Sequence, residues 1–150
     1  MWASLDGKNE RGDYQRKGQN WKKIEDNIRV IQRECKTVLF GVNTTVSILN
    51  VLEIPSFYKY MVINNFVQPD RMNLYLLFDP SYYAITNLTP NLKKQVITQF
   101  KEFEERFLNK MSGEQVANFK NHINAVITFM MAKEGREQKE FKHWIETIDK

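Results

Sequence analysis

Polar side chains that could hold a small polar ligand lie in three short segments of the chain. Ser4 and Asp6 end the first apolar segment, and Arg16 lies in the polar stretch that follows it. Asn43 and Ser47 belong to an alternating, β-branched segment further along. A hydroxyl donates and accepts hydrogen bonds, a carboxylate accepts them, and a guanidinium can pair with two carboxylate oxygens at once. These residue types indicate a site for a polar ligand.

The elements that must position these side chains alternate between strands and helices. Residues 1–7 are typical of the end of a buried strand with polar groups at its carboxyl tip, whereas residues 8–18 are polar, contain two glycines and predict a loop. Asn20 is a favourable N-cap, and after it apolar residues recur at spacings of three and four, which predicts a helix. Residues 38–48 alternate and are rich in β-branched side chains, which favours a strand.

The second half of the chain is predominantly helical. Pro55 predicts the start of a short helix over 56–66, and residues 72–78 have the length and composition of a strand. A tyrosine-rich loop precedes Thr89 and Pro90, which predict the cap of a helix reaching about residue 111. The remaining predictions are a capping box at 112–115 that opens a helix to about residue 133, and a last helix that carries Phe141, Trp144, Ile145 and Ile148.

This order predicts an α/β fold with parallel strands, and specifically a fragment of a partial (β/α) TIM-like barrel. We expect residues 1–88 to form the second half of the barrel and residues 89–150 a helical extension packed on it in one structural unit. If Val42, Thr44 and Val46 pack against helices, alternation directs Asn43, Thr45 and Ser47 into the barrel. A chain that begins inside such a unit is expected to be part of a larger enzyme.

Composition excludes several other classes. The chain has 150 residues, 42% of them hydrophobic, which is enough for one domain with a core. The net charge of +4 comes from cations interleaved with anions, so a nucleic-acid surface is not expected. No apolar run reaches the length of about 20 residues that a membrane span needs. The single cysteine, Cys35, fits a reducing compartment, so we expect a cytoplasmic protein.

Several segments taken together resemble the radical S-adenosylmethionine (SAM) enzymes. Ser-Leu-Asp-Gly at 4–7, Asp-Tyr-Gln-Arg-Lys-Gly at 13–18 with Trp21, and Ile-Glu-Asp-Asn-Ile at 24–28 resemble the fourth strand and helix of that barrel. The run from Val42 to Asn50, followed by Leu-Glu-Ile-Pro at 52–55, resembles the fifth. The segments 79–83 and 87–93 are similar to the region after the sixth strand in the subgroup with a twitch-type accessory region.

The resemblance implies a cofactor, a cluster and a reaction. Members of the family bind a [4Fe–4S] cluster through three cysteines spaced C-x3-C-x2-C, and the cluster cleaves SAM to a 5′-deoxyadenosyl radical. This chain lacks that motif, so we expect the cluster-binding half to lie upstream of Met1 and the chain alone to be inactive. The expected partners are that half or a second copy of the chain, and a peptide is one implied substrate class.

The resemblance gives each candidate residue a cofactor role beside a structural one. Ser4 could contact the ribose or the amino acid part of SAM, and we expect it to. Asp6 could accept hydrogen bonds from the same parts of SAM, and the alternative, which we favour, is a turn with Gly7 in which Asp6 bonds its own backbone. Arg16 could clamp the methionine carboxylate or could be an ordinary surface arginine. Asn43 and Ser47 are expected to face the cofactor, the alternative for Asn43 being bonds to neighbouring backbone groups.

One rival to the enzymatic interpretation remains. A non-enzymatic module that binds another protein through its helices should fold and remain monomeric alone. A barrel fragment would instead expose an unpaired sheet edge, which favours association.

His122 and His143 have no partners at metal-ligand spacing, so no metal site is expected in this chain.

Overall fold

Three parallel strands form a sheet in the sequential order β1–β2–β3. The computed structural model describes residues 1–132. The strands are β1 (Trp2–Ser4), β2 (Gly41–Val46) and β3 (Met72–Leu76), and the helices are α1 (Asn9–Gln15), α2 (Trp21–Glu34), α3 (Ile54–Ile63), α4 (Pro90–Arg106) and α5 (Gly113–Met131). The predicted α/β class and parallel sheet are therefore confirmed.

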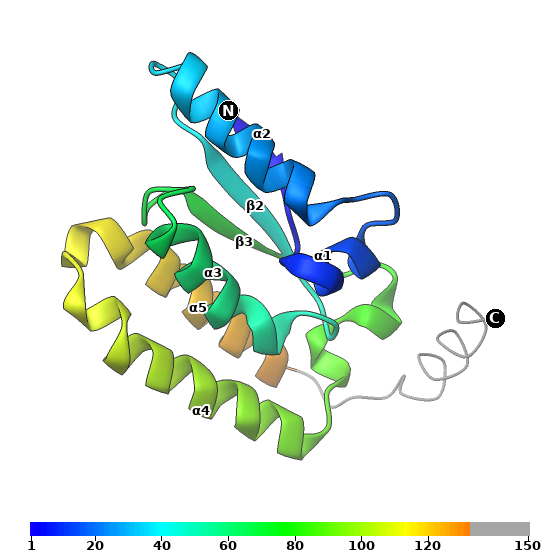
Figure 1. Ribbon diagram of the computed structural model, residues 1–150. Helices are drawn as coiled ribbons and strands as arrows, with labels where there is room; N and C mark the ends of the chain where they lie inside the picture. The colour runs from blue at the N-terminus through cyan, green and yellow to red at the C-terminus, as the bar shows by residue number, and fades with distance from the viewer. Residues whose placement is uncertain (133–150) are drawn as a thin grey trace.

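Helices α2 and α3 connect the strands and cover the same face of the sheet (Figure 1). The Trp21 ring of α2 lies 6.0 Å from the Phe57 ring of α3, measured between centroids. Val42, Val46 and Met72 point to this face and are fully buried. When successive strands are added in one direction and their crossovers have the same handedness, the crossover helices lie on the same side of the sheet. The other face of this sheet has no helix on it among residues 1–132.

Helices α4 and α5 extend the same core beyond β3. Tyr58 of α3 stacks on Phe119 of α5 at 3.9 Å between ring centroids, and its ring meets Phe103 of α4 edge to face. The buried core is continuous from Leu5 to Met130. The described part of the helical extension thus shares one core with the strands.

Helix α5 also closes one edge of the sheet. In β3 the odd-numbered residues bond to β2, since Val42 donates its N–H to the Arg71 carbonyl and Leu77 donates to Val46. Leu74 therefore directs its backbone outward, and His122 of α5 hydrogen-bonds to it there. The outer edge of β1 has no strand beside it among the described residues.

The helix caps follow the sequence with one exception. Asn20 accepts a hydrogen bond from the Lys23 N–H, and Thr89 accepts one from the Leu92 N–H. Both residues are therefore N-caps, as predicted. Ser112 is the N-cap of α5 but makes no side-chain cap bond, so the predicted capping box does not form. The predicted helix at residues 141–148 lies outside the described residues.

Several predicted boundaries were wrong for physical reasons. Residues 8–18 do not form only a loop, because α1 occupies 9–15 with the buried Gly12 packed against the Gly7 backbone. The strand predicted over 38–48 is limited to β2, because a turn begins at Ser47. Helix α3 begins one residue before Pro55 and ends at Ile63, shortly before Asn65 adopts a positive φ of 54°.

Candidate functional site

The uncovered face of the sheet carries polar side chains in register across all three strands. Ser4 of β1 is paired with Asn43 of β2, and Asn43 is paired with Asn73 of β3. Ser4 is exposed, whereas both asparagines are half-buried. Alternation places these three residues opposite the face that α2 and α3 cover. Two of the predicted site residues, Ser4 and Asn43, are thus brought together here.

A second row lies toward the amino ends of the strands. It contains Trp2, Gly41 and Arg71, which occupy matching positions in and next to the strands. The Trp2 ring lies over Gly41, and the Arg71 guanidinium is 5.9 Å from the centre of that ring. The Trp2 and Arg71 side chains cover the amino end of the uncovered face, so a ligand on this face would lie toward the carboxyl ends of the strands.

Asp6 and Arg16 form an ion pair at the carboxyl end of β1. Arg16 Nε lies 2.8 Å from Asp6 Oδ2, and the Thr45 N–H donates to Asp6 Oδ1, also at 2.8 Å. The Asp6 side chain is 13% exposed and the Arg16 side chain 38%. Asp6 therefore joins β1 to β2 rather than bonding its own backbone in a turn. The two terminal nitrogens of Arg16 make no hydrogen bond or ion pair with residues 1–132.

Asn50 holds the turn that follows β2. Its amide nitrogen donates to the carbonyls of Asp6 and Thr45, at 2.9 and 2.8 Å, and its amide oxygen accepts the Ser47 N–H at 2.8 Å. Asn50 is 1% exposed. It thus satisfies neighbouring backbone groups and holds the ends of two strands together.

Ser47 is buried in the same turn. Its hydroxyl accepts the Leu49 N–H at 3.2 Å. The alternation that predicted an inward direction for Ser47 ends with Val46, the last residue of β2. The structure therefore places Ser47 apart from Ser4 and Asn43, as part of the turn.

The two tyrosines after β3 anchor their loop to this turn. The Tyr82 and Tyr83 rings are 4.9 Å apart, both are half-buried, and the Tyr83 carbonyl accepts the Ile48 N–H. Burial raises the pKa of Tyr83 to about 12, with smaller contributions from Tyr82 and Tyr14. The structural explanation that the sequence favours for a paired tyrosine, a ring that anchors a loop, agrees with these contacts.

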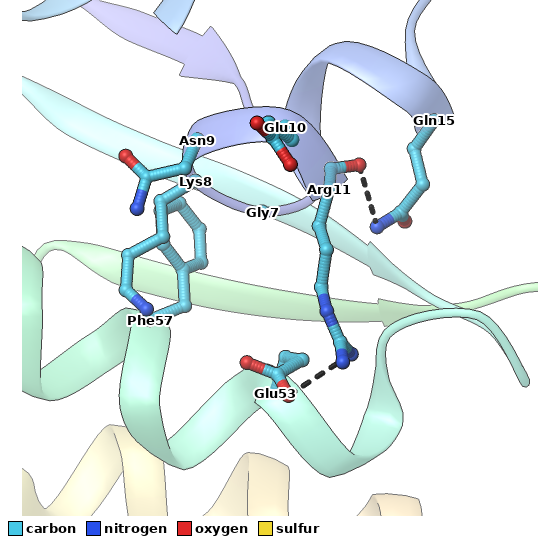
Figure 2. Close-up of a pocket in the computed structure, with 8 residues that line it drawn as sticks. All are labelled: Gly7, Lys8, Asn9, Glu10, Arg11, Gln15, Glu53 and Phe57. Atoms are coloured by element: carbon cyan, nitrogen blue, oxygen red, sulfur yellow. Dashed lines mark hydrogen bonds and ion pairs between the residues drawn. The ribbon is translucent and has the colours of Figure 1, made fainter.

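A cavity of about 480 Å³ lies between α1 and the start of α3 (Figure 2). Arg11 extends from α1 to Glu53, at 3.0 Å between charged atoms, and Lys8 Nζ donates to Ser56 at 2.9 Å. Both cations are thus engaged by α3 or the residues just before it. The cavity lies on the side of the sheet where the helices pack, apart from the uncovered face.

Asn73 and Asn118 also contribute to the uncovered face of the sheet, although neither was predicted as a site residue. Asn118 of α5 donates to Asn73, and Asn73 donates to Asn43. Asn73 could have been found from the alternation of residues 72–78, because it occupies an uncovered position in that predicted strand. Nothing in the sequence pattern brings Asn118 to it.

A metal centre is not found among residues 1–132, where no group of three histidine, cysteine or acidic side chains could hold an ion. Within the same residues no helix combines the length and apolar composition that a membrane crossing requires. Comparisons with models of known protein families, with curated proteins and with solved structures found no match to this chain.

Proposed function

We propose that this chain forms the second half of a radical SAM-type barrel and supplies one wall of its SAM pocket. The observation that carries the proposal is the uncovered face with Ser4, Asn43 and Asn73 in register. Parallel sheets are normally covered on both faces. In a barrel every crossover helix lies outside, and the face without helices is the interior, where the ligand binds near the carboxyl ends of the strands.

The side chains on this face suit the polar parts of SAM. The Ser4 hydroxyl and the Asn43 amide can bond ribose hydroxyls or ring nitrogens. The terminal nitrogens of Arg16 are available for a carboxylate at the carboxyl end of β1, while Asp6 holds its Nε. Asp6 supports this arrangement from the carboxyl end of β1, whereas Ser47 belongs to the turn after β2 and has no direct role in the proposed pocket.

The described residues do not fit a [4Fe–4S] cluster. Cys35 is exposed and follows α2, whose carboxyl end lies near the amino ends of the strands, whereas Asp6 lies at their carboxyl ends. The proposal therefore assigns no step of the radical reaction to this chain. The cluster would come with the first half of the barrel, which would pair with the outer edge of β1. We also propose that this protein is located in the cytoplasm.

Nuclear magnetic resonance titration of the 150-residue chain with SAM tests this proposal, because it detects the weak binding that half a site retains. We expect shifts at Ser4, Asn43 and Asn73, and we expect Asn43→Leu to weaken binding about tenfold, the value of one lost hydrogen bond to a ligand. Asn27→Leu, on the exposed surface of α2, is the matched control and should leave the affinity unchanged.

Two results would contradict the proposal. One is a set of spectra that millimolar SAM leaves unchanged. The other is binding that the Asn27 and Asn43 variants weaken equally. Either result, together with a monomeric and cooperatively folded chain, would favour the module that binds another protein through its helices.

A further inference from the structure

Three asparagines form a chain of amide hydrogen bonds from α5 to the middle of the sheet. Asn118 Nδ2 lies 3.2 Å from Asn73 Oδ1, and Asn73 Nδ2 lies 3.1 Å from Asn43 Oδ1. We call Asn43, Asn73 and Asn118 the amide row. Asn118 donates to Asn73 and Asn73 donates to Asn43, so the row has a direction that ends at Asn43.

The end of the row on α5 is held by the packing of that helix. Val116 and Phe119 flank Asn118 in the sequence and are fully buried. One turn later His122 bonds to the backbone of Leu74 at the edge of β3. The backbone of Asn118 is therefore held in place by the core and the sheet edge, and its exposed side chain reaches Asn73 from this fixed position.

At the other end of the row, the Asn43 amide nitrogen makes no hydrogen bond with residues 1–132. The Asn43 oxygen is occupied by Asn73. The Asn43 nitrogen is left on the uncovered face, where the exposed Ser4 is next to it in register. The hydrogen-bond network sets the orientation of an amide, so this network decides whether Asn43 offers a ligand its nitrogen or its oxygen.

We infer that Asn73 and Asn118 are positioning residues that hold Asn43 as a hydrogen-bond donor toward an acceptor on the ligand. For the ligand the inference rests on the proposed function, since the ring nitrogens, ribose oxygens and carboxylate of SAM are all acceptors. A donor fixed in advance costs little to order on binding. A ligand that presents a donor to the Asn43 nitrogen would leave both groups unpaired. Unpaired polar groups discriminate between ligands more strongly than differences in apolar contact do.

Asn118→Asp tests the inference because a carboxylate only accepts hydrogen bonds. Asn73 would have to donate to the new carboxylate and present its oxygen to Asn43. Asn43 would then donate to Asn73 and offer its own oxygen to the ligand. We expect SAM affinity to fall about tenfold or more, as for a lost hydrogen bond with an unpaired acceptor. Asn118→Ala, which removes the anchor without reversing the row, should have the smaller effect.

Asn121→Asp is the matched control, because it adds the same charge to an exposed position of the same helix. The direct readout is the pair of side-chain amide signals of Asn43 in the free protein, which a stability defect alone would not exchange. These signals should change in Asn118→Asp and remain unchanged in Asn121→Asp.

The outcomes separate this inference from the proposed function. Asn43 signals that are the same in wild type and Asn118→Asp would overturn the inference, whatever the protein binds. Signals that change, in a wild-type protein that SAM does not perturb, would support the orientation of Asn43 and overturn the proposed ligand. Signals that change with equal SAM affinity in both variants would overturn the positioning role.

Discussion

The ring of Trp2 lies over Gly41 of the neighbouring strand, so closely that a Cβ at Gly41 would be 2.5 Å from it. A Cβ atom cannot lie that close to a ring, so the Trp2 ring can occupy this position only because residue 41 is glycine. The contact gives the short strand β1 a fixed position against β2.

Gly41→Ala should therefore lower the free energy of unfolding by about 1–3 kcal/mol, as overpacking does. In a Trp2→Ala background the same substitution should cost close to nothing, because the ring it meets is absent. Urea unfolding followed by circular dichroism measures both. Equal costs of Gly41→Ala in the two backgrounds would contradict the contact.

Two substitutions of Asp6 should separate the contributions of its two hydrogen bonds to the free energy of unfolding. Asp6→Asn keeps an acceptor for the Thr45 N–H but loses the charge opposite Arg16, and we expect a cost of about 1 kcal/mol because that arginine is partly exposed. Asp6→Ala loses both bonds and should cost about 2 kcal/mol. Thermal and urea unfolding of the two variants provide the comparison. If both variants cost the same, the bond to Thr45 contributes nothing.

Stability should depend on pH through His122. Burial lowers the pKa of His122 in the folded chain, and a hydrogen bond to the backbone of Leu74 works in the opposite direction. The unfolded chain, with a histidine pKa of about 6.5, binds this proton first, so stability should decrease as the pH falls through about 6.5 and below. Melting temperatures from pH 7.5 downward in wild type and His122→Gln test this: the variant should lose that part of the decrease.

Self-association should occur through the outer edge of β1. Met1 and Leu5 bond to β2, so the backbone N–H of Ser4 points away from the sheet. Ser4→Pro removes that donor without breaking a bond to β2. We expect the isolated chain to associate, Ser4→Pro to make it monomeric and Ser4→Ala to leave it associated, as measured by light scattering. A wild-type chain that is monomeric when concentrated would count against an open edge that needs a partner.

Local signals predicted most of the fold. Asn20 and Thr89 predicted the starts of α2 and α4 because an N-cap acts on residues only three positions away. Helix α1 was missed because much of its support comes from residues distant in the sequence: Arg11 pairs with Glu53, and Lys8 donates to Ser56.

Residues of the candidate site could be predicted only where the pattern of a single strand identifies them. Alternation identified Asn43, and the polar tip of the first strand identified Ser4. The pairing of Asp6 with Thr45 spans 39 positions, and that of Asn73 with Asn118 spans 45. No period or spacing specifies which residues meet over such separations, because the packing of whole elements decides it.

Helix α5 covers one edge of the sheet, and this limits how far association can proceed. A molecule with two open edges can add copies at both and grow into a fibre. Two copies of this chain that join through β1 would present α5 at each outer end, and residues 1–132 would leave no open strand edge to extend. Association of this kind is self-limiting: it ends at a closed pair, and the hydrogen bond between His122 and Leu74 helps to hold the cover in place.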